Sequence, residues 1–205
     1  MSRIFLALFL LAATALAGKP EGFLGIQWGA SPEEAKRIMQ ARPGVKFPED
    51  TDDYRFELTG GTFAGQPVAK WTLEFPERKF ASATVVIKTE GDPQSMYKDF
   101  RAQLVAKYGN ATTNQKLSIK APRGTYPRPS SFGTVSTWKF SPNLKDKSAI
   151  TIACEMAGPD GGPTSSPAQL QVVLRYTNES LNAAAAENMV SADKPAAVGV
   201  KKDEL

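Results

Sequence analysis

The chain has 205 residues, a formal net charge of +4, 41% hydrophobic residues, one cysteine and no histidine. Its length and hydrophobic content allow one domain with an ordinary core, or two small domains. The absence of histidine excludes Ser-His-Asp and Cys-His catalysis and histidine-ligated metal sites. A single cysteine excludes an internal disulfide and a thiolate zinc cluster, which leaves carboxylate, lysine or tyrosine chemistry.

Residues 1–17 have the pattern of a secretory signal peptide. Arg3 supplies a short positive region, residues 4–17 are apolar, and Ala15-Leu16-Ala17 offers a small-x-small cleavage pattern before Gly18. The apolar run is too short to cross a bilayer core of about 30 Å as a helix. We therefore expect an exported protein with no transmembrane segment, periplasmic or extracellular.

Residues 18–91 are expected to form a first half, in which one helix precedes three strands. Ser31, followed three residues later by Glu34, forms a capping box, and Pro32 suits the first helical position. The predicted helix ends at Pro43-Gly44. The buried side of this helix is formed by Ala35, Ile38 and Met39. The three predicted strands are residues 54–59, residues 68–75, with Ala69, Trp71, Leu73 and Phe75 on one face, and residues 80–88.

Residues 92–177 are expected to repeat this order. Asp92 suits an N-cap, Pro93 the first helical position and Gly109 the end of a helix. The apolar face of this helix is formed by Tyr97, Phe100, Leu104 and Tyr108. The strands predicted after it are residues 134–141, 148–156 and 169–176, and a short edge strand is allowed at 117–119. The predicted inward side chains of these strands are Trp138 and Phe140, then Ile150, Ile152 and Cys154, then Leu170, Val172, Leu174 and Tyr176.

Residues 178–205 are expected to begin with an alanine-rich helix capped by Asn178 and to end in a frayed tail. The predicted fold class is therefore α+β, with two tandem α-β-β-β halves whose helices pack on antiparallel sheet.

This order of elements resembles the β-lactamase-inhibitor protein and the small domain of the outer-membrane assembly lipoproteins. The phrases Gly25-Ile26-Gln27-Trp28-Gly29-Ala30-Ser31-Pro32-Glu33-Glu34-Ala35 and Leu104-Val105-Ala106-Lys107-Tyr108-Gly109 are similar to phrases in exported bacterial proteins. The likeness covers most of residues 22–177, but no lipid-bearing cysteine follows the cleavage point. The resemblance implies binding or assembly in the cell envelope and carries over no individual contact residue.

Three motifs suggest chemistry, and each has a structural alternative. Ser95-Met96-Tyr97-Lys98 and Ser136-Thr137-Trp138-Lys139 match the S-x-x-K pattern of penicillin-binding enzymes, but the S-D-N and K-T-G partner motifs are absent. The acidic turn formed by Glu49, Asp50, Asp52 and Asp53 suits calcium in residue type, but not in EF-hand spacing. Cys154 alternates with Ile150 and Ile152, which favours a core position over a redox thiol.

The connection between Asn110 and Lys147 is rich in basic residues with interleaved aromatic residues. We expect it to bind an acidic protein or an anionic component of the envelope, unless it is simply a solvated loop. Nucleic acid is a poor partner for an exported chain with this modest charge. The predicted binding residues are Lys120, Arg123, Tyr126, Arg128 and Phe132.

The last four residues, Lys202, Asp203, Glu204 and Leu205, spell an endoplasmic-reticulum retrieval signal. If they act as one, the protein is a resident of the reticulum lumen, and Asn110 and Asn178 are possible glycosylation acceptors. The sequence predicts an exported, non-catalytic binding or envelope-assembly protein without a metal or cofactor. A small carboxylate-dependent hydrolase is the alternative, and it requires paired acids converging in a pocket.

Overall fold

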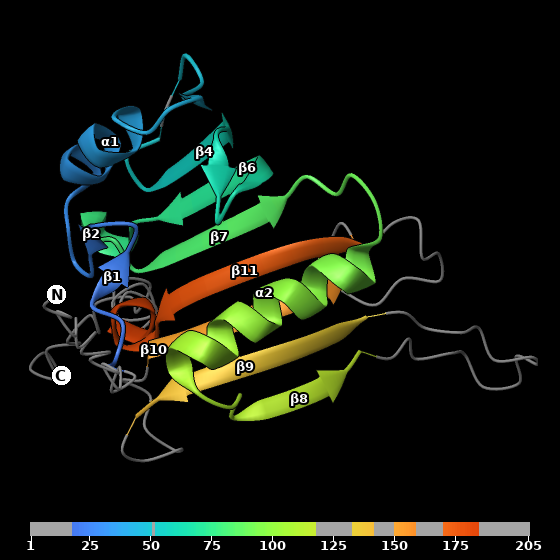
Figure 1. Cartoon of the computed structure of the whole chain (residues 1–205). Coiled ribbons are helices and arrows are strands. Elements are labelled where there is room, and N and C mark those ends of the chain that lie inside the picture. Colours follow the sequence, from blue (N-terminus) through green and yellow to red (C-terminus); the bar gives the residue numbers. More distant parts are fainter. Residues whose placement is uncertain (1–17, 51, 118–132, 142–149, 159–169, 185–205) are drawn as a thin grey trace, which may run out of the picture.

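The computed structural model describes residues 18–50, 52–117, 133–141, 150–158 and 170–184. Its elements, in chain order, are β1 (Gly22–Phe23), β2 (Ile26–Gln27), α1 (Pro32–Gln40), β3 (Val45–Lys46), β4 (Arg55–Gly60), β5 (Thr62–Phe63), β6 (Gln66–Glu74), the 3-10 helix η1 (Pro76–Arg78), β7 (Ser82–Ile87), α2 (Pro93–Tyr108), β8 (Thr113–Lys116), β9 (Thr134–Phe140), β10 (Ile150–Ala157) and β11 (Gln171–Asn178). Together they form a mixed α+β fold with a large antiparallel sheet, which confirms the α+β part of the prediction (Figure 1).

One large antiparallel sheet organises the molecule. Its strand order is β3-β4-β6-β7-β11-β10-β9-β8, with β5 paired to β6 off this path, and β1 and β2 form a separate hairpin. The strands on either side of α2 in the sequence meet where β7 pairs with β11, from Val172 opposite Ile87 to Thr177 opposite Ser82. The early and late strands therefore belong to a single sheet.

Both helices begin at the caps that the sequence predicted. Ser31 Oγ accepts a hydrogen bond from the backbone N–H of Glu34 at 3.3 Å, at the start of α1. Asp92 accepts from the N–H groups of Gln94 and Ser95 at 3.0 and 3.1 Å, at the start of α2. Such side-chain caps satisfy N–H groups that the first helical turn leaves without partners.

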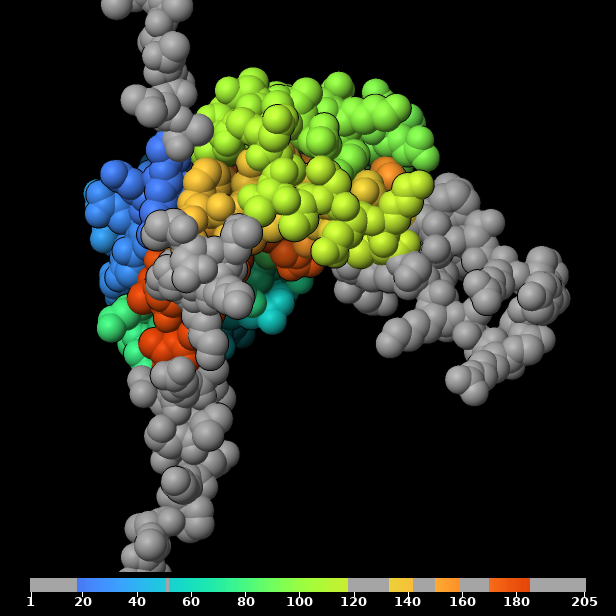
Figure 2. All heavy atoms as spheres, turned by 90° about the horizontal axis from the view of Figure 1, so that it is seen from below, coloured from blue at the N-terminus to red at the C-terminus, as the bar shows by residue number. Residues whose placement is uncertain are grey.

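The helices occupy different places on the sheet. Helix α2 packs across β10 and β11, whereas α1 lies beside β2 and β3 near the opposite end of the sheet (Figure 1). In the view from below, the atoms of α2 lie on one side of those of β9 and β10 (Figure 2). Ala35 and Met39 of α1 and Tyr97, Phe100 and Leu104 of α2 are buried in one core cluster.

Alternation along the strands supplies the sheet side of that core. Inward side chains stand opposite one another from strand to strand, so that apolar rows run across the sheet. One such row is Phe56, Leu73, Ala83, Tyr176, Ile152 and Trp138, and the next is Leu58, Trp71, Val85, Leu174, Cys154 and Ser136. We call this side of the sheet the core face.

Two details differ from the sequence prediction. The register of β6 against β7 shifts between Val68 and Lys70, so Val68 is buried and Ala69 is exposed, and the predicted inward position of Ala69 is wrong. Such a bulge inserts one residue and reverses the alternation on one side of it. The described residues after α2 also include a strand that was not predicted, β8 at Thr113–Lys116, whereas Leu117 is not in a strand and the rest of the predicted edge strand, residues 118–119, lies outside the described residues.

The start of the C-terminal helix follows the predicted cap. Asn178 Oδ1 accepts from the backbone N–H groups of Ser180 and Leu181 at 3.2 and 3.4 Å, and residues 179–184 are helical. The rest of the predicted alanine-rich helix, and the predicted signal peptide, lie outside the described residues. Within the described ranges, no helix combines the length and apolar character needed to span a membrane.

Candidate binding surface

The binding residues predicted from the sequence, Lys120, Arg123, Tyr126, Arg128 and Phe132, lie outside the described residues. The same holds for Lys202, Asp203, Glu204 and Leu205. The described residues instead present another polar surface, on the side of the sheet opposite the core face.

We call this surface the outer face. It consists of the outward-pointing side chains of β4, β6, β7, β11, β10 and β9, which pair across the strands in three rows. The first row is Arg55, Glu74, Ser82, Thr177, Thr151 and Lys139; the second is Glu57, Thr72, Thr84, Arg175, Ala153 and Thr137; the third is Lys70, Val86, Val173, Glu155 and Val135. Hydroxyl groups and charged groups thus share a face whose strands are hydrogen-bonded into one sheet.

Arg175 occupies the centre of the outer face. Its strand, β11, lies between β7 and β10, and its row neighbours are Thr84 and Ala153. Arg175 Nε donates to Glu155 Oε1 at 3.0 Å, and Nη1 donates to Thr84 Oγ1 at 3.3 Å. The Glu155 side chain is only 14% exposed, whereas that of Arg175 is 42% exposed. The carboxylate is therefore the buried partner that orients the guanidinium, and the guanidinium reaches solvent.

Glu57 forms a second charged group, at the β4 side of the outer face. It accepts from Arg55 Nη2 at 2.6 Å and from Lys70 Nζ at 2.9 Å. The hydrogen bond from Lys70, together with the charges of Lys70 and Arg55, lowers the pKa of Glu57 from its ordinary value, although partial desolvation opposes this. This exposed carboxylate is therefore stabilised in its ionised form.

A hollow of about 460 Å³ adjoins this group. Its lining comes from the turn before β4, from β4 itself and from Lys70 in the middle of β6: Pro48, Asp50, Asp52, Arg55, Glu57, Leu58, Thr59 and Lys70. It brings three carboxylates and two cations to one edge of the sheet. The sequence pattern alone did not indicate that the acidic turn and strand β4 line one hollow.

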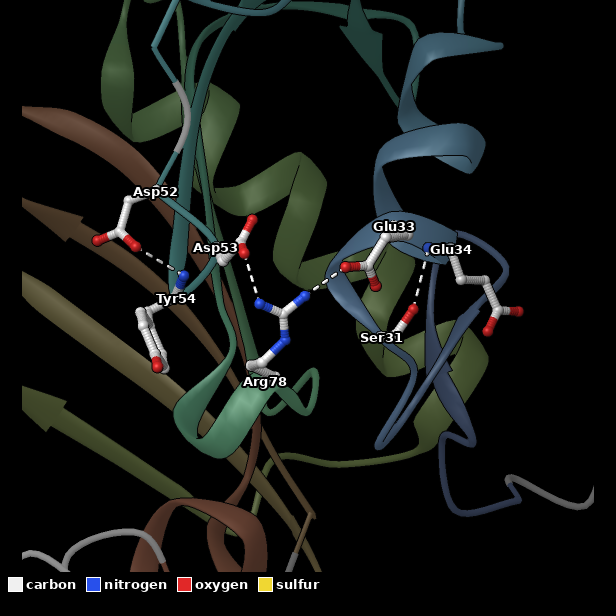
Figure 3. A network of polar contacts seen from close by, with 7 residues as sticks. All are labelled: Ser31, Glu33, Glu34, Asp52, Asp53, Tyr54 and Arg78. Carbon is white, nitrogen blue, oxygen red and sulfur yellow. Dashed lines mark hydrogen bonds and ion pairs between the residues drawn. The ribbon is translucent and has the colours of Figure 1, made fainter.

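The acidic turn itself is tied into the fold by Arg78 (Figure 3). The Arg78 guanidinium forms ion pairs with Asp53 and with Glu33 of α1. Asp52 Oδ1 accepts from the backbone N–H of Tyr54 at 2.9 Å, which closes a local turn. The hydrogen bond and charge of Asp53, with the charge of Glu33, raise the pKa of Arg78.

These contacts supply partners within the protein for two of the acids for which the sequence analysis considered calcium. Among the described residues, no cluster of three or more His, Cys, Asp or Glu side chains has the arrangement needed for a metal ion.

The two S-x-x-K matches differ in position. Ser95 and Lys98 are exposed in the first turns of α2. Ser136 is fully buried on the core face, whereas Lys139 points to the outer face and lies 3.8 Å from Glu179. Ser136 and Lys139 therefore lie on opposite faces of β9, because residues three apart in a strand point to opposite sides.

Ser136 belongs to a buried hydrogen-bond cluster beneath α2. Its Oγ donates to Asn114 Oδ1 at 2.6 Å, accepts from Arg101 Nε at 3.1 Å and lies 2.7 Å from the Tyr97 hydroxyl. Because the single hydroxyl hydrogen of Ser136 goes to Asn114, the Tyr97 hydroxyl must donate to Ser136. The cluster satisfies these polar groups and fastens α2 to β8 and β9.

Cys154 stands opposite Ser136 in the sheet and is fully buried, as the sequence predicted. Burial, with a contribution from the charge of Glu155, raises the pKa of the Cys154 thiol to about 12, although Arg101 acts in the opposite direction. A thiol in this environment is a small apolar side chain and a poor nucleophile.

A second, smaller hollow of about 200 Å³ lies where α2 begins. Its lining is Gln66, Glu90, Asp92, Ser95, Met96, Asp99, Phe100 and Gln103. Asp92 caps the helix with its carboxylate, and Glu90 pairs with Lys88 at 2.7 Å, which lowers the pKa of Glu90 through the hydrogen bond and charge of Lys88. These two acids therefore already have partners within the fold.

Sequence reasoning missed the central pair of the outer face. Arg175 was one of the outward positions left between the predicted inward residues Leu174 and Tyr176. The signal was therefore present in the alternation. The proximity of Arg175 to Glu155 and Thr84 could not be predicted from the sequence, because it depends on the β10–β11 and β7–β11 registers.

Comparison with known proteins returned no match to a family model, to a curated protein or to a solved structure. The resemblance to the β-lactamase-inhibitor protein and to the assembly lipoproteins therefore stays a prediction from element order and two short phrases.

Proposed function

We propose that this is an exported, non-catalytic binding protein that holds a protein partner against the outer face of its sheet. The observation that carries the proposal is the difference between the two faces. Helices α1 and α2 bury their apolar side chains in the core cluster, whereas the outer face combines charged and hydroxyl side chains with a few small apolar ones, Val86, Val135, Val173 and Ala153. A rigid sheet holds these groups in fixed positions, which reduces the entropy lost on binding.

The kind of contact that the outer face supports is protein–protein recognition. Its charged side chains are held by neighbours, as Arg175 is by Glu155 and Thr84, and Glu57 by Arg55 and Lys70. Fixed charges on a surface provide specificity and register more than raw affinity. The basic connection predicted to bind acidic partners, including Arg123 and Arg128, extends this proposal as a second contact region.

The predicted duplication of a helix-plus-three-strand half belongs to the same proposal. Its support is the order of elements, with α1 before β4, β6 and β7, and α2 before β8 to β11. A sheet built from two such halves suits the resemblance to the β-lactamase-inhibitor protein and to envelope-assembly lipoproteins. A periplasmic or extracellular location follows from the predicted signal peptide, and a reticulum location remains the alternative.

The alternative function, a carboxylate-dependent hydrolase, has one observation in its favour. Asp50, Asp52 and Glu57 line the same hollow. A general acid of this kind needs a raised pKa, but the pKa of Glu57 is lowered by Lys70 and Arg55. We therefore prefer the binding function.

Site-specific photocrosslinking in the source cells tests the proposal. A photoreactive amino acid replaces Thr137, on the outer face, in one variant, and Ala106, exposed on α2, in a matched control. We expect a discrete crosslinked species from position 137 and none from position 106. Crosslinks from position 106 alone, or equal adducts from both positions, contradict the proposal.

A further inference from the structure

The chemistry of the partner follows from the donors that Arg175 leaves unused; this step rests on the proposed binding role of the outer face. An arginine has five N–H donors in a planar fork. Two of them are used, by Glu155 and Thr84. Within the described part of the chain, Nη2 has no hydrogen-bond partner. The end of the guanidinium that bears Nη2 is therefore available to a planar, doubly accepting group such as a carboxylate.

The surroundings of Arg175 leave room for such a group. On the two strands beside it, the nearest outer-face side chains are short: Thr84 on β7 and Ala153 on β10. The neighbouring row places Ser82, Thr177 and Thr151 alongside. The longer charged side chains Arg55, Glu57 and Lys70 stand on β4 and β6, towards one margin. The row on the other side of Arg175 is Val86, Val173 and its own partner Glu155, so Arg175 is the long cationic side chain between short hydroxyl side chains and two valines.

The support that Arg175 receives distinguishes it from the other cations of the outer face. Lys139 is 3.8 Å from Glu179, and Arg55 and Lys70 share Glu57, which is 46% exposed. Arg175 alone among these is bonded to a carboxylate as buried as Glu155. Arginine anchors held in place at the centre of an interface are the side chains that contribute most to binding.

We propose that the outer face binds an acidic segment of a partner protein, one carboxylate of which pairs with the free end of Arg175. Charge complementarity supports this occupant, since the three rows of the outer face hold four cations, Arg55, Lys70, Lys139 and Arg175, against three carboxylates, Glu57, Glu74 and Glu155. The flanking hydroxyl groups of Thr84 and Thr177 provide donors to further oxygens of the segment.

Titration of the full chain with a capped hexaglutamate peptide tests this proposal, with capped hexaglutamine as the uncharged probe. We expect hexaglutamate alone to bind, more tightly at low ionic strength. Arg175→Gln is expected to weaken binding about tenfold or more, and Arg175→Lys by a smaller factor, since lysine keeps the charge but loses the fork. The matched control Arg37→Gln makes the same change at an exposed position of α1, away from the outer face, and is expected to alter binding less than about threefold.

A second variant keeps the test valid if Arg175→Gln does not fold. Thr177→Glu places a carboxylate two residues from Arg175 on the same face of β11, at a half-buried position, where it competes for the free end of the guanidinium. This variant is expected to fold and to weaken hexaglutamate binding about as much as Arg175→Gln. Equal affinity of the original chain and of both variants overturns the proposal, as does equal weakening by Arg37→Gln.

Two further outcomes identify what is wrong. If inorganic phosphate or an anionic lipid vesicle binds through Arg175 and hexaglutamate does not, the proposed occupant is wrong. If photocrosslinks form at position 137 but no variant of Arg175 alters binding, the outer face is the binding surface and Arg175 is not its anchor. Absence of both results contradicts the binding role itself.

Discussion

Cys154 shows how the fold determines the chemistry of a single residue. The alternation of Ile150, Ile152 and Cys154 predicted an inward thiol, and the structure buries it completely opposite Ser136. Burial also changes the ionisation of the thiol, which the alternation alone did not predict. Removal from water and the nearby charge of Glu155 raise the pKa of the thiol to about 12.

We therefore expect Cys154 to resist thiol reagents in the native protein. A pKa of about 12 leaves about one thiol in ten thousand ionised at pH 8, compared with a sizeable fraction for an ordinary cysteine. Labelling with a maleimide or a disulfide reagent should be about a thousandfold slower in the folded chain than in denaturant. Equal rates in the two states would contradict the buried position.

Single residues also show where sequence reasoning reaches its limit. Alternation identified Trp71, Leu73 and Phe75 as inward and left Arg175 outward, both as observed. It placed Ala69 wrongly, because the bulge beside Val68 is a property of two strands and not of one. The Arg175–Glu155 contact likewise joins residues of two strands.

Elements whose signals are local were predicted well. The caps of α1 and α2 involve residues within three positions of one another, so Ser31 and Asp92 were identifiable in the sequence. Strand β8 was not, because all four of its residues are exposed at the sheet edge and show no apolar alternation. Its position depends on β9, to which it is paired.

The attachment of α2 to the sheet depends on Ser136. In Ser136→Ala, Tyr97, Arg101 and Asn114 lose a shared buried partner, so we expect a loss of about 1–3 kcal/mol in the free energy of unfolding. Thr137→Ala, one residue away on the outer face, is the matched control and should change it by less than about 0.5 kcal/mol. Urea denaturation measures both, and equal values would contradict the role of the cluster.

The hairpin between β5 and β6 contains a strained residue. Ala64 has φ +48° and is followed by Gly65 at φ +80°, a combination typical of a type I′ turn. Ala64 is exposed, so Ala64→Asn or Ala64→Gly removes the strain without loss of packing and should stabilise the fold by roughly 0.5–1 kcal/mol. Ala69→Gly, in an exposed strand position, is the control and should destabilise it. Thermal denaturation distinguishes the two signs.

At the scale of the whole molecule, the pH dependence of stability follows from the carboxylates. Hydrogen bonds at the N-terminus of α1 lower the pKa of Glu33, with a contribution from Arg78, and Lys70 and Lys88 lower those of Glu57 and Glu90. A carboxyl group whose folded pKa lies below its unfolded pKa stabilises the fold above the unfolded value. That contribution is lost as the pH falls through the folded pKa.

We therefore expect the melting temperature to fall as the pH decreases below about 5. The chain has no histidine, so the melting temperature should be nearly constant between about pH 5.5 and about pH 7.5. Calorimetry from below about pH 5 to about pH 7.5 measures both the fall and the constant region. A difference of about 5 °C or more in melting temperature between about pH 5.5 and about pH 7.5 would require another titrating group and would contradict this assignment.

Sequence patterns did not predict how the early and late strands pair to form one sheet. Each strand had a local signal, but the pairing of β7 with β11 links residues 82–87 to residues 172–177. Period-two patterns identify strands and the face each residue occupies, but they do not specify the partner strand. The outer face, whose central rows cross this junction, therefore became visible only in the structure.

Hydroxyl-radical footprinting of the full chain, free and bound to its crosslinked partner, tests the binding role of the outer face most directly. Val86 and Val135 are half-buried outer-face side chains, whereas Met96 and Tyr108 are half-buried on α2. We predict lower oxidation of Val86 and Val135 in the complex and unchanged oxidation of Met96 and Tyr108. Protection of Met96 and Tyr108, with Val86 and Val135 unchanged, would contradict the account.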